Sequence, residues 1–174
     1  MDIDAIKSYA LSNSDIERIL GKTKILTYPE LGDLRNWEDA FDEQGRSVVL
    51  FLTENEQTGH WVGLIRNDKT IEYFDPYGEA PEGDKKWLSK EKLRQLDQDK
   101  PYLTNLLRAS GLKVYYNQHQ FQQDRGDVNT CGRWVVSRLL LRKKSLKQFY
   151  NYVMKGGNKP DDFVSALTFK ILGK

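Results

Sequence analysis

Three strand-forming segments follow one another in the first half of the chain, and they constrain the fold more than any other part of it. Residues 46–53 (RSVVLFLT) form a continuous apolar run with β-branched side chains, which is typical of a strand buried on both faces. Residues 60–66 (HWVGLIR) and 69–75 (KTIEYFD) are separated by Asn67 and Asp68, which tolerate the positive φ angles of a two-residue turn. The pattern therefore predicts a hairpin beside a buried strand.

Helical patterns surround these strands. Ser14 opens an S-x-x-E capping box, and residues 131–144 (CGRWVVSRLLLRKK) are apolar around much of the helix circumference, which predicts a central, buried helix. The order of helix, strands and helices predicts one α+β domain over residues 1–174. The other predicted elements are irregular structure at 22–45, a helix at 89–109 broken near Pro101, a strand at 112–116, and helices at 145–155 and 161–172, the last with Asp161 as N-cap.

Composition narrows the classes of function. Apolar residues make up 39% of the chain and charged residues 30%, as in soluble globular proteins. No run approaches the roughly eighteen apolar residues that a membrane span needs, so we expect no membrane partner. The single cysteine excludes an internal disulfide and fits a reducing compartment. With one Cys and two His, a zinc site cannot be assembled from its usual ligands. We therefore expect no metal and no cofactor.

His60 and Asp75 are predicted to face each other across the hairpin. If Asn67 and Asp68 form the turn, residues 66 and 69 pair, and the ladder then places His60 opposite Asp75. Side chains in opposed positions have Cβ atoms about 4.5–5.5 Å apart. Such an imidazole–carboxylate pair fixes the tautomer of the ring and favours its protonated form. A structural ion pair would have the same pattern, and a slip of one residue would separate the two side chains.

Cys131 stands where a polar loop meets the apolar helix, with Asn129 or Thr130 as the expected N-cap. A helix N-terminus lowers the pKa of a thiol, and a neighbouring imidazolium lowers it further. The backbone N–H groups there can also hold an oxyanion. A lone cysteine is more often a small buried apolar residue. The position at a helix start, followed by Gly132, favours a catalytic thiol instead.

Three motifs in this order resemble the adenovirus-type and ubiquitin-like-protein proteases: residues 59–61 (GHW), 73–78 (YFDPYG) and, after a Gln-bearing loop, 129–132 (NTCG). In that family the order is His, Asp or Glu, Gln and Cys, and Cys-Gly opens the central helix. The matched segments span residues 59–141. The resemblance implies a papain-like cysteine protease fold of the adenain type, in which the helix that bears the cysteine packs on a small mixed or antiparallel sheet.

The resemblance also implies roles for the matched residues. Cys131 is expected to be the nucleophile, His60 its general base and Asp75 the acid that orients the histidine. Trp61 is expected beside the substrate channel near the scissile bond, although a tryptophan on a strand can equally face the core.

A glutamine in the loop before the cysteine donates to the oxyanion in this family. The usual spacing falls on Asp124 or Arg125 in this chain, so the pattern departs from the family here. The nearest glutamines are Gln123 and Gln122, as though a short insertion preceded Cys131. We favour Gln123 on spacing and keep Gln122 as the alternative.

The resemblance leaves several functions open. The short N-terminal part favours a monomeric viral maturation protease that cuts structural precursor proteins at Gly-Gly-like sites, in the host cytoplasm or nucleus or inside the virion. A protease that removes ubiquitin-like modifiers is the alternative, and an acetyltransferase on the same scaffold is a third possibility. A binding module without catalysis belongs to a different class, and the presence of Cys, His and Asp together argues against it.

A basic cluster follows the cysteine. Cations at a helix C-terminus on a solvated face account for it. The resemblance suggests a DNA contact as the alternative, because adenovirus-type proteases are stimulated by DNA. The cluster comprises Arg138, Arg142, Lys143, Lys144 and Lys147.

Overall fold

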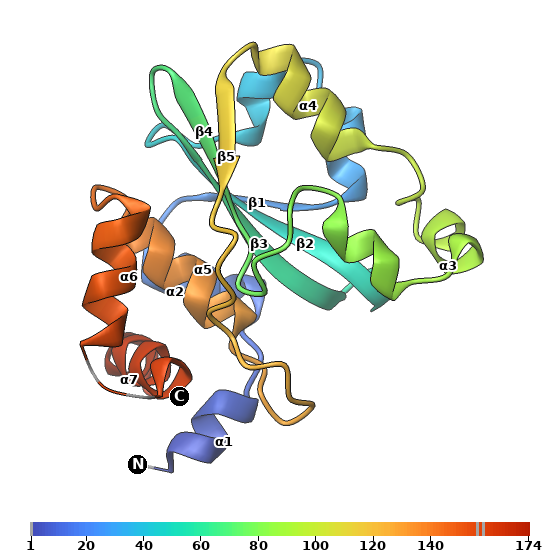
Figure 1. The fold of residues 1–174 in the computed structure, drawn as a ribbon. Coiled ribbons are helices and arrows are strands. Elements are labelled where there is room, and N and C mark those ends of the chain that lie inside the picture. The colour runs from blue at the N-terminus through green and yellow to red at the C-terminus, as the bar shows by residue number, and fades with distance from the viewer. Residues whose placement is uncertain (1, 156, 158) are drawn as a thin grey trace.

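The computed structural model describes residues 2–155, 157 and 159–174, and it has a five-stranded mixed sheet between two layers of helices (Figure 1). The strands lie side by side in the order of the sequence. The outer pairs, β1–β2 and β4–β5, are parallel, and the inner pairs are antiparallel. The predicted α+β class and mixed sheet are therefore confirmed. The strands are β1 (Lys24–Thr27), β2 (Arg46–Asn55), β3 (Thr58–Arg66), β4 (Thr70–Phe74) and β5 (Lys113–Tyr116).

The two helical layers cover opposite faces of the sheet (Figure 1). Helix α5 packs on β3 and is in contact with α2 and α7, whereas α4 and two 3₁₀ helices lie on the other face. Within the described residues, no helix is long and apolar enough to cross a membrane. The helices are α1 (Ile3–Ser8), α2 (Asn13–Leu20), α3 (Lys90–Gln95), α4 (Tyr102–Ser110), α5 (Cys131–Leu140), α6 (Leu146–Met154) and α7 (Pro160–Leu172), and the 3₁₀ helices are η1 (Pro29–Asp33), η2 (Trp37–Ala40) and η3 (Gly83–Trp87).

Strand β2 is buried on both faces, as its continuous apolar run predicted. Val48, Leu50 and Leu52 join the core beneath α5, and Val49 and Phe51 join the core beneath α4. None of the five is more than 4% exposed. Full burial of a side chain of this size contributes roughly 1.5–3 kcal/mol, so this strand anchors both layers.

Helix α5 is the predicted central helix, and it approaches the sheet over a glycine. A Cβ atom added to Gly63 of β3 would lie 3.1 Å from Cγ1 of Val135, so a larger residue would push the helix outward. The helix ends at Leu140, four residues before the predicted end at residue 144. Leu141 is the C-cap residue, and the guanidinium of Arg138 donates to its carbonyl, one of those that the helix itself leaves without a donor.

Two predictions for the N-terminal third were wrong. The capping box of α2 begins at Ser12 and uses Asp15, two residues earlier than the predicted start at Ser14. The segment 24–27, predicted to be irregular, forms β1 and pairs with β2 in parallel. Four residues carry too little periodicity to reveal a strand whose stability comes from the neighbouring strand.

Asp161 is not the N-cap of α7. Pro160 occupies the first helical position, where its missing N–H is not needed, and Lys159 is the cap residue. Asp161 is buried instead, and its Oδ1 accepts from Oγ1 of Thr130 at 2.5 Å and from Nε1 of Trp134 at 2.8 Å. It therefore ties the C-terminal helix to the start of α5.

The β3–β4 hairpin has a longer loop than predicted. Arg66 pairs with Ile71 rather than with residue 69, a slip of two residues, so His60 is not directly opposite Asp75. Because side chains alternate with a period of two, a slip of two keeps both on the same face of the hairpin. The predicted register was therefore wrong, but the prediction that His60 and Asp75 lie on the same face of the hairpin was right.

Candidate active site

His60, Asp75 and Cys131 come together at one end of the sheet. His60 is the third residue of β3, Asp75 directly follows β4, and Cys131 is the first residue of α5. Nε2 of His60 lies 2.8 Å from Oδ1 of Asp75. All three side chains are buried, with 5%, 0% and 9% of their surface exposed. The elements that hold them are the hairpin and the central helix, which the sequence pattern identified.

The electrostatics favour a charged Cys–His pair. Burial alone would lower the pKa of His60, but hydrogen bonds to Asp75 and Cys131 raise it well above its usual value. Burial would likewise raise the pKa of the Cys131 thiol, but the hydrogen bond to His60 and its charge lower it overall. Since Asp75 holds Nε2, the nitrogen left for the thiol is Nδ1. The pair is therefore expected to be thiolate and imidazolium near neutral pH.

The backbone around Asp75 is held by a side chain from the loop after β5. Oδ1 of Asn117 accepts from the N–H of Asp75 at 3.0 Å, and Nδ2 of Asn117 donates to the carbonyl of Asp75 at 2.7 Å and to that of His119 at 2.8 Å. Gly78 has φ of 77°, and a Cβ atom there would lie 2.8 Å from the carbonyl carbon of His119. The glycine of the YFDPYG motif is therefore required for the two loops to meet.

Two aromatic rings enclose the imidazole of His60. The ring of Tyr77 stacks on it at 4.9 Å between centroids, and Trp87 meets it edge-on at 5.5 Å. These contacts restrict rotation of the imidazole and limit its access to water. Trp87, 42% exposed, was not among the predicted site residues, because residues 76–87 looked like a Gly- and Pro-containing loop and not like η3. The one indication in the sequence was that this loop contains a tryptophan, Trp87.

His60 and Cys131 line a cleft, which we call the catalytic cleft after the role predicted for these two residues. It is lined by Gly59, His60, Tyr77, Trp87, Gln122 and Cys131, among others. A second groove, between the segment before α2 and the β2–β3 hairpin, is lined by residues that include Leu11, Thr27, Gly59 and Trp61. Gly59 borders both grooves, so the two adjoin at this residue.

Trp61 has both of the environments that the sequence left open. It is only 5% exposed and belongs to the core beneath α5, where its Nε1 donates to the carbonyl of Leu11 at 3.0 Å. It also lines the second groove. A Cβ atom on Gly132 would lie 3.1 Å from Cδ1 of Trp61, so the glycine after the cysteine lets the helix start pack against this ring.

The structure brings Gln122 into the catalytic cleft and leaves Gln123 outside its lining. Gln123 is exposed, and its backbone N–H donates to Asp161 at 3.0 Å. Gln122 is 2% exposed, and Nε2 donates one hydrogen to the carbonyl of Val128 at 3.1 Å. Its own N–H donates to the carbonyl of Pro76, which fixes it beside the Asp75 loop. Spacing favoured Gln123, whereas the fold brings Gln122 into the cleft.

Among the described residues, one cluster has ligand atoms close enough to hold a metal ion. One ligand atom each of His60, Asp75 and Asp84 lie within 4.8 Å of one another. Nε2 of His60 and Oδ1 of Asp75, however, are already joined by the 2.8 Å hydrogen bond. The arrangement is that of an imidazole supported by carboxyl groups, and Asp84 is a member that the sequence analysis missed.

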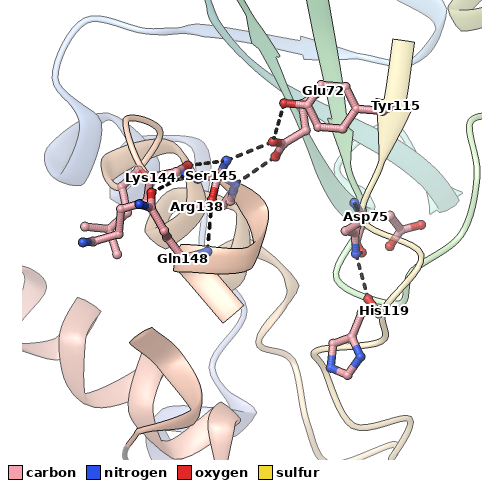
Figure 2. Close-up of polar contacts among 10 residues, drawn as sticks. Glu72, Asp75, Tyr115, His119, Arg138, Lys144, Ser145 and Gln148 are labelled. Carbon is pink, nitrogen blue, oxygen red and sulfur yellow. Dashed lines mark hydrogen bonds and ion pairs between the residues drawn. The ribbon is translucent and has the colours of Figure 1, made fainter. Parts of the chain in front are cut away.

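One member of the predicted basic cluster is not on the surface. Arg138 is 2% exposed, and its guanidinium makes a two-bond contact with Glu72 at 2.8 and 2.9 Å (Figure 2). A guanidinium that is buried and paired with Glu72 cannot reach a phosphate, so Arg138 is excluded from contact with DNA. DNA binding through the rest of the cluster stays a prediction; these residues are Arg142, Lys143, Lys144 and Lys147.

Comparison with known proteins finds one sequence relative of high similarity. Uncharacterized protein V9 of the Sputnik virophage is 38% identical over 165 residues, which cover 91% of this chain and 94% of that protein. No protein-family model matches the chain.

Two crystal structures of the ASFV pS273R protease share a likeness in fold. One is 16% identical with a TM-score of 0.49 and covers 92% of this chain and 67% of its own. The other is 19% identical with a TM-score of 0.38 and covers 72% and 42%. At TM-scores below 0.5, these likenesses do not bear on the chemistry of the site.

Proposed function

This chain belongs to the family of protein V9 of the Sputnik virophage, and we propose that it is a cysteine protease that cleaves peptide bonds through Cys131. One observation carries the proposal: a thiol of lowered pKa at a helix N-terminus adjoins a buried imidazole that a carboxylate holds at 2.8 Å. A cysteine that only fills the core needs neither partner. Nucleophile, base and orienting acid are the three groups that covalent acyl transfer requires.

The mechanism follows from the hydrogen bonds. The thiolate of Cys131 attacks the carbonyl carbon of the substrate. The resulting oxyanion accepts hydrogen bonds from the backbone N–H of Cys131 and from the second N–H of the Gln122 amide. The imidazolium of His60 gives the Nδ1 proton to the departing amine, and the C–N bond breaks to leave a thioester. His60 then takes a proton from water, which attacks the thioester and releases the acid. Asp75 keeps the ring in the tautomer that makes both transfers possible.

The two grooves suggest how a peptide lies. The leaving group must depart on the side of His60, which is the side of the catalytic cleft that Trp87 borders. The acyl portion then extends past Gly59 into the second groove, beside Trp61. The resemblance to the adenovirus-type proteases implies small residues on the acyl side of the cut, and we propose Gly-Gly in the first instance.

A viral maturation protease is the proposed biological role. The virophage origin of the relative supports it, together with the motifs shared with adenovirus-type proteases. Structural precursor proteins would then be the substrates. A deconjugating protease for ubiquitin-like modifiers uses the same site, and cleavage of a modifier conjugate in preference to a precursor protein would identify it. Dependence on acetyl-CoA would indicate an acetyltransferase instead.

The experiment that tests the chemistry is alkylation of Cys131 by iodoacetamide as a function of pH. Since the chain has one cysteine, the rate reports this thiol alone. We expect fast labelling well below pH 8.5, the ordinary pKa of a free thiol, and loss of this fast labelling in His60→Ala. His119→Ala is the matched control, because it removes the other histidine, which is exposed, and should label as the wild type does.

Two outcomes would count against the proposal. An ordinary thiol profile in both the wild type and His60→Ala would favour a binding module that keeps the scaffold without catalysis. Turnover of a Gly-Gly peptide by Cys131→Ala would contradict the role of the nucleophile directly. Since the thiol of Cys131 faces the cleft, the alanine variant is expected to keep its fold.

A further inference from the structure

Asp84 lies behind the triad, on the short helix η3 that also carries Trp87. It is 3% exposed. One of its carboxyl oxygens, one of Asp75 and a ring nitrogen of His60 lie within 4.8 Å of one another. The mechanism above assigns no part to this carboxyl group. Its burial against the acid of the triad nevertheless requires a physical account, because a buried charge without a partner is costly.

Helix η3 is fixed firmly in place by the residue before it. Glu82 adopts a left-handed conformation, with φ of 71°. Its Oε1 accepts from the backbone N–H of Thr104 at 2.9 Å, and its Oε2 accepts from the hydroxyl of Tyr28 at 2.5 Å and pairs with Lys85 at 2.8 Å. A non-glycine residue keeps such a conformation only where its surroundings hold it. Asp84, two residues on, is therefore held against the triad.

One oxygen of each of the two carboxyl groups lacks a hydrogen-bond donor. Oδ1 of Asp75 accepts from His60 and from the N–H of Tyr77, both at 2.8 Å. Among the described residues, Oδ2 of Asp75 and Oδ1 of Asp84 are buried without a partner. Two ionised carboxylates this close repel each other, whereas one proton held between them satisfies both groups.

The charged groups nearby do not remove the need for that proton. The two lysines of η3 are already paired, Lys85 with Glu82 and Lys86 with Glu79. Burial raises the pKa of Asp84 to about 8, the charge of Asp75 adds to the rise, and His60 opposes it. The titratable groups that face Asp84 are His60 from β3, Tyr73 from β4, Asp75 after it, Glu79 and Glu82 from the loop before η3, and Tyr28 from the segment before η1.

We infer that Asp84 is a positioning residue of the triad: in its protonated form it donates a hydrogen bond to Asp75, so the acid behind His60 is a pair of carboxyl groups that share one proton. The shared proton orients the carboxylate of Asp75 with Oδ1 toward the imidazole. It also limits the charge behind His60 to one unit. This role rests on the proposed protease function.

Loss of the shared proton would alter catalysis in a definite direction. With both carboxyl groups ionised, a second negative charge would hold the proton on His60 more tightly. The imidazolium would then be a poorer acid toward the departing amine. We therefore expect the pH profile of turnover to decline on its basic side as Asp84 ionises.

The direct test is a carbon-13 NMR titration of protein labelled at the aspartate carboxyl groups. We expect one carboxyl resonance in the wild type to titrate near pH 8 and to disappear in Asp84→Asn. If every carboxyl group of the wild type titrates below pH 6, the shared proton does not exist and the inference is overturned. This readout needs no substrate, so it stands apart from the test of protease activity.

The functional test compares two variants of similar shape. Asp84→Leu removes the donor, and we expect alkylation of Cys131 at pH 6 to slow by at least about tenfold, the scale of one hydrogen bond to a charged group. Asp84→Asn keeps an N–H donor and should recover most of that rate, but should lose the decline of turnover near pH 8. Equal rates in the wild type and both variants would overturn the positioning role. An unreactive thiol in the wild type would overturn the protease proposal and with it the positioning role, whereas the NMR titration would still report whether the two carboxyl groups share a proton.

Discussion

Two buried pairs of opposite charge lie close together in this protein, and they are built differently. In the first, Glu72 of β4 accepts from Arg138 of α5 through both carboxyl oxygens and from the hydroxyl of Tyr115 at 3.2 Å. The guanidinium also donates to the carbonyls of Leu141 and Lys144, each at 3.0 Å (Figure 2). Both carboxyl oxygens and every nitrogen of the guanidinium thus have a protein partner.

The second pair, His60 and Asp75, is left incomplete. Asp75 lies three residues beyond Glu72, yet its Oδ2 has no partner among the described residues unless Asp84 carries a proton. The other nitrogen of His60 faces the thiol of Cys131 in the catalytic cleft. A pair whose groups are almost all used holds elements together. A pair with open positions can accept and release protons, as the proposed protease chemistry requires of His60.

Asp75→Asn should have the largest effect, and it should act on turnover. The asparagine amide favours the wrong imidazole tautomer and cannot stabilise the imidazolium, so we expect kcat/KM on a Gly-Gly peptide to fall by roughly 10³–10⁴. Glu79→Gln is the matched control, because it removes a carboxylate from the cleft rim that pairs with Lys86 and not with His60. Similar losses in both variants would mean that general charge, and not orientation, matters.

Arg138→Met should act on stability instead. It leaves the carboxylate of Glu72 buried without its cation, and breaking such a pair costs about 3–5 kcal/mol of unfolding free energy. Urea unfolding would measure the loss. The double variant Glu72→Met with Arg138→Met removes both charges and should recover a large part of it. A double variant as unstable as the single one would contradict the view that the uncompensated charge is the cause.

The loop glutamines give a third test. Gln122→Ala removes a proposed oxyanion donor and should lower kcat by about 10²–10³. Gln123→Ala changes the adjacent, exposed side chain and should leave kcat near the wild-type value. The reverse order would restore the assignment based on spacing. Thermal unfolding of both variants would show whether a loss at Gln122 comes from the fold instead, because the Gln122 amide also bonds the carbonyl of Val128.

The parts of the fold that sequence could predict are those with long, strongly patterned segments. A continuous apolar run such as that of β2 is stable only as a strand buried on both faces. A helix that is apolar around its circumference, such as α5, has to be buried in the core. The hairpin register was missed because Asn67 and Asp68 favour a turn without fixing its length. The pairing of His60 with Asp75 survived because the error was an even number of residues.

The parts of the site that sequence could not predict depend on contacts between loops. Gln122 is selected by its N–H bond to the carbonyl of Pro76, which no local pattern encodes. Asp84 looked like one of many charged loop residues, and only the three-dimensional structure shows that it is buried behind Asp75. The sequence could therefore predict the candidate site residues on long strands and helices. Those on loops could be identified only from the three-dimensional structure.

The smallest predicted effect concerns stability and pH. Because the pKa of Asp84 is about 8 in the folded protein and about 3.8 when unfolded, the folded state alone holds this proton between those values. The unfolded state then binds fewer protons, so unfolding free energy falls as pH rises, by about 1.4 kcal/mol per unit.

Asp84→Asn removes this titration, so wild type should lose about 2–3 kcal/mol more than the variant between pH 5 and pH 7. Urea unfolding at the two pH values would measure the difference. Asp68→Asn, a change at an exposed loop position, should follow the wild type and serves as the control. Parallel pH dependence in the wild type and Asp84→Asn would mean that Asp84 is ionised throughout. The unpartnered oxygens behind His60 would then need another donor.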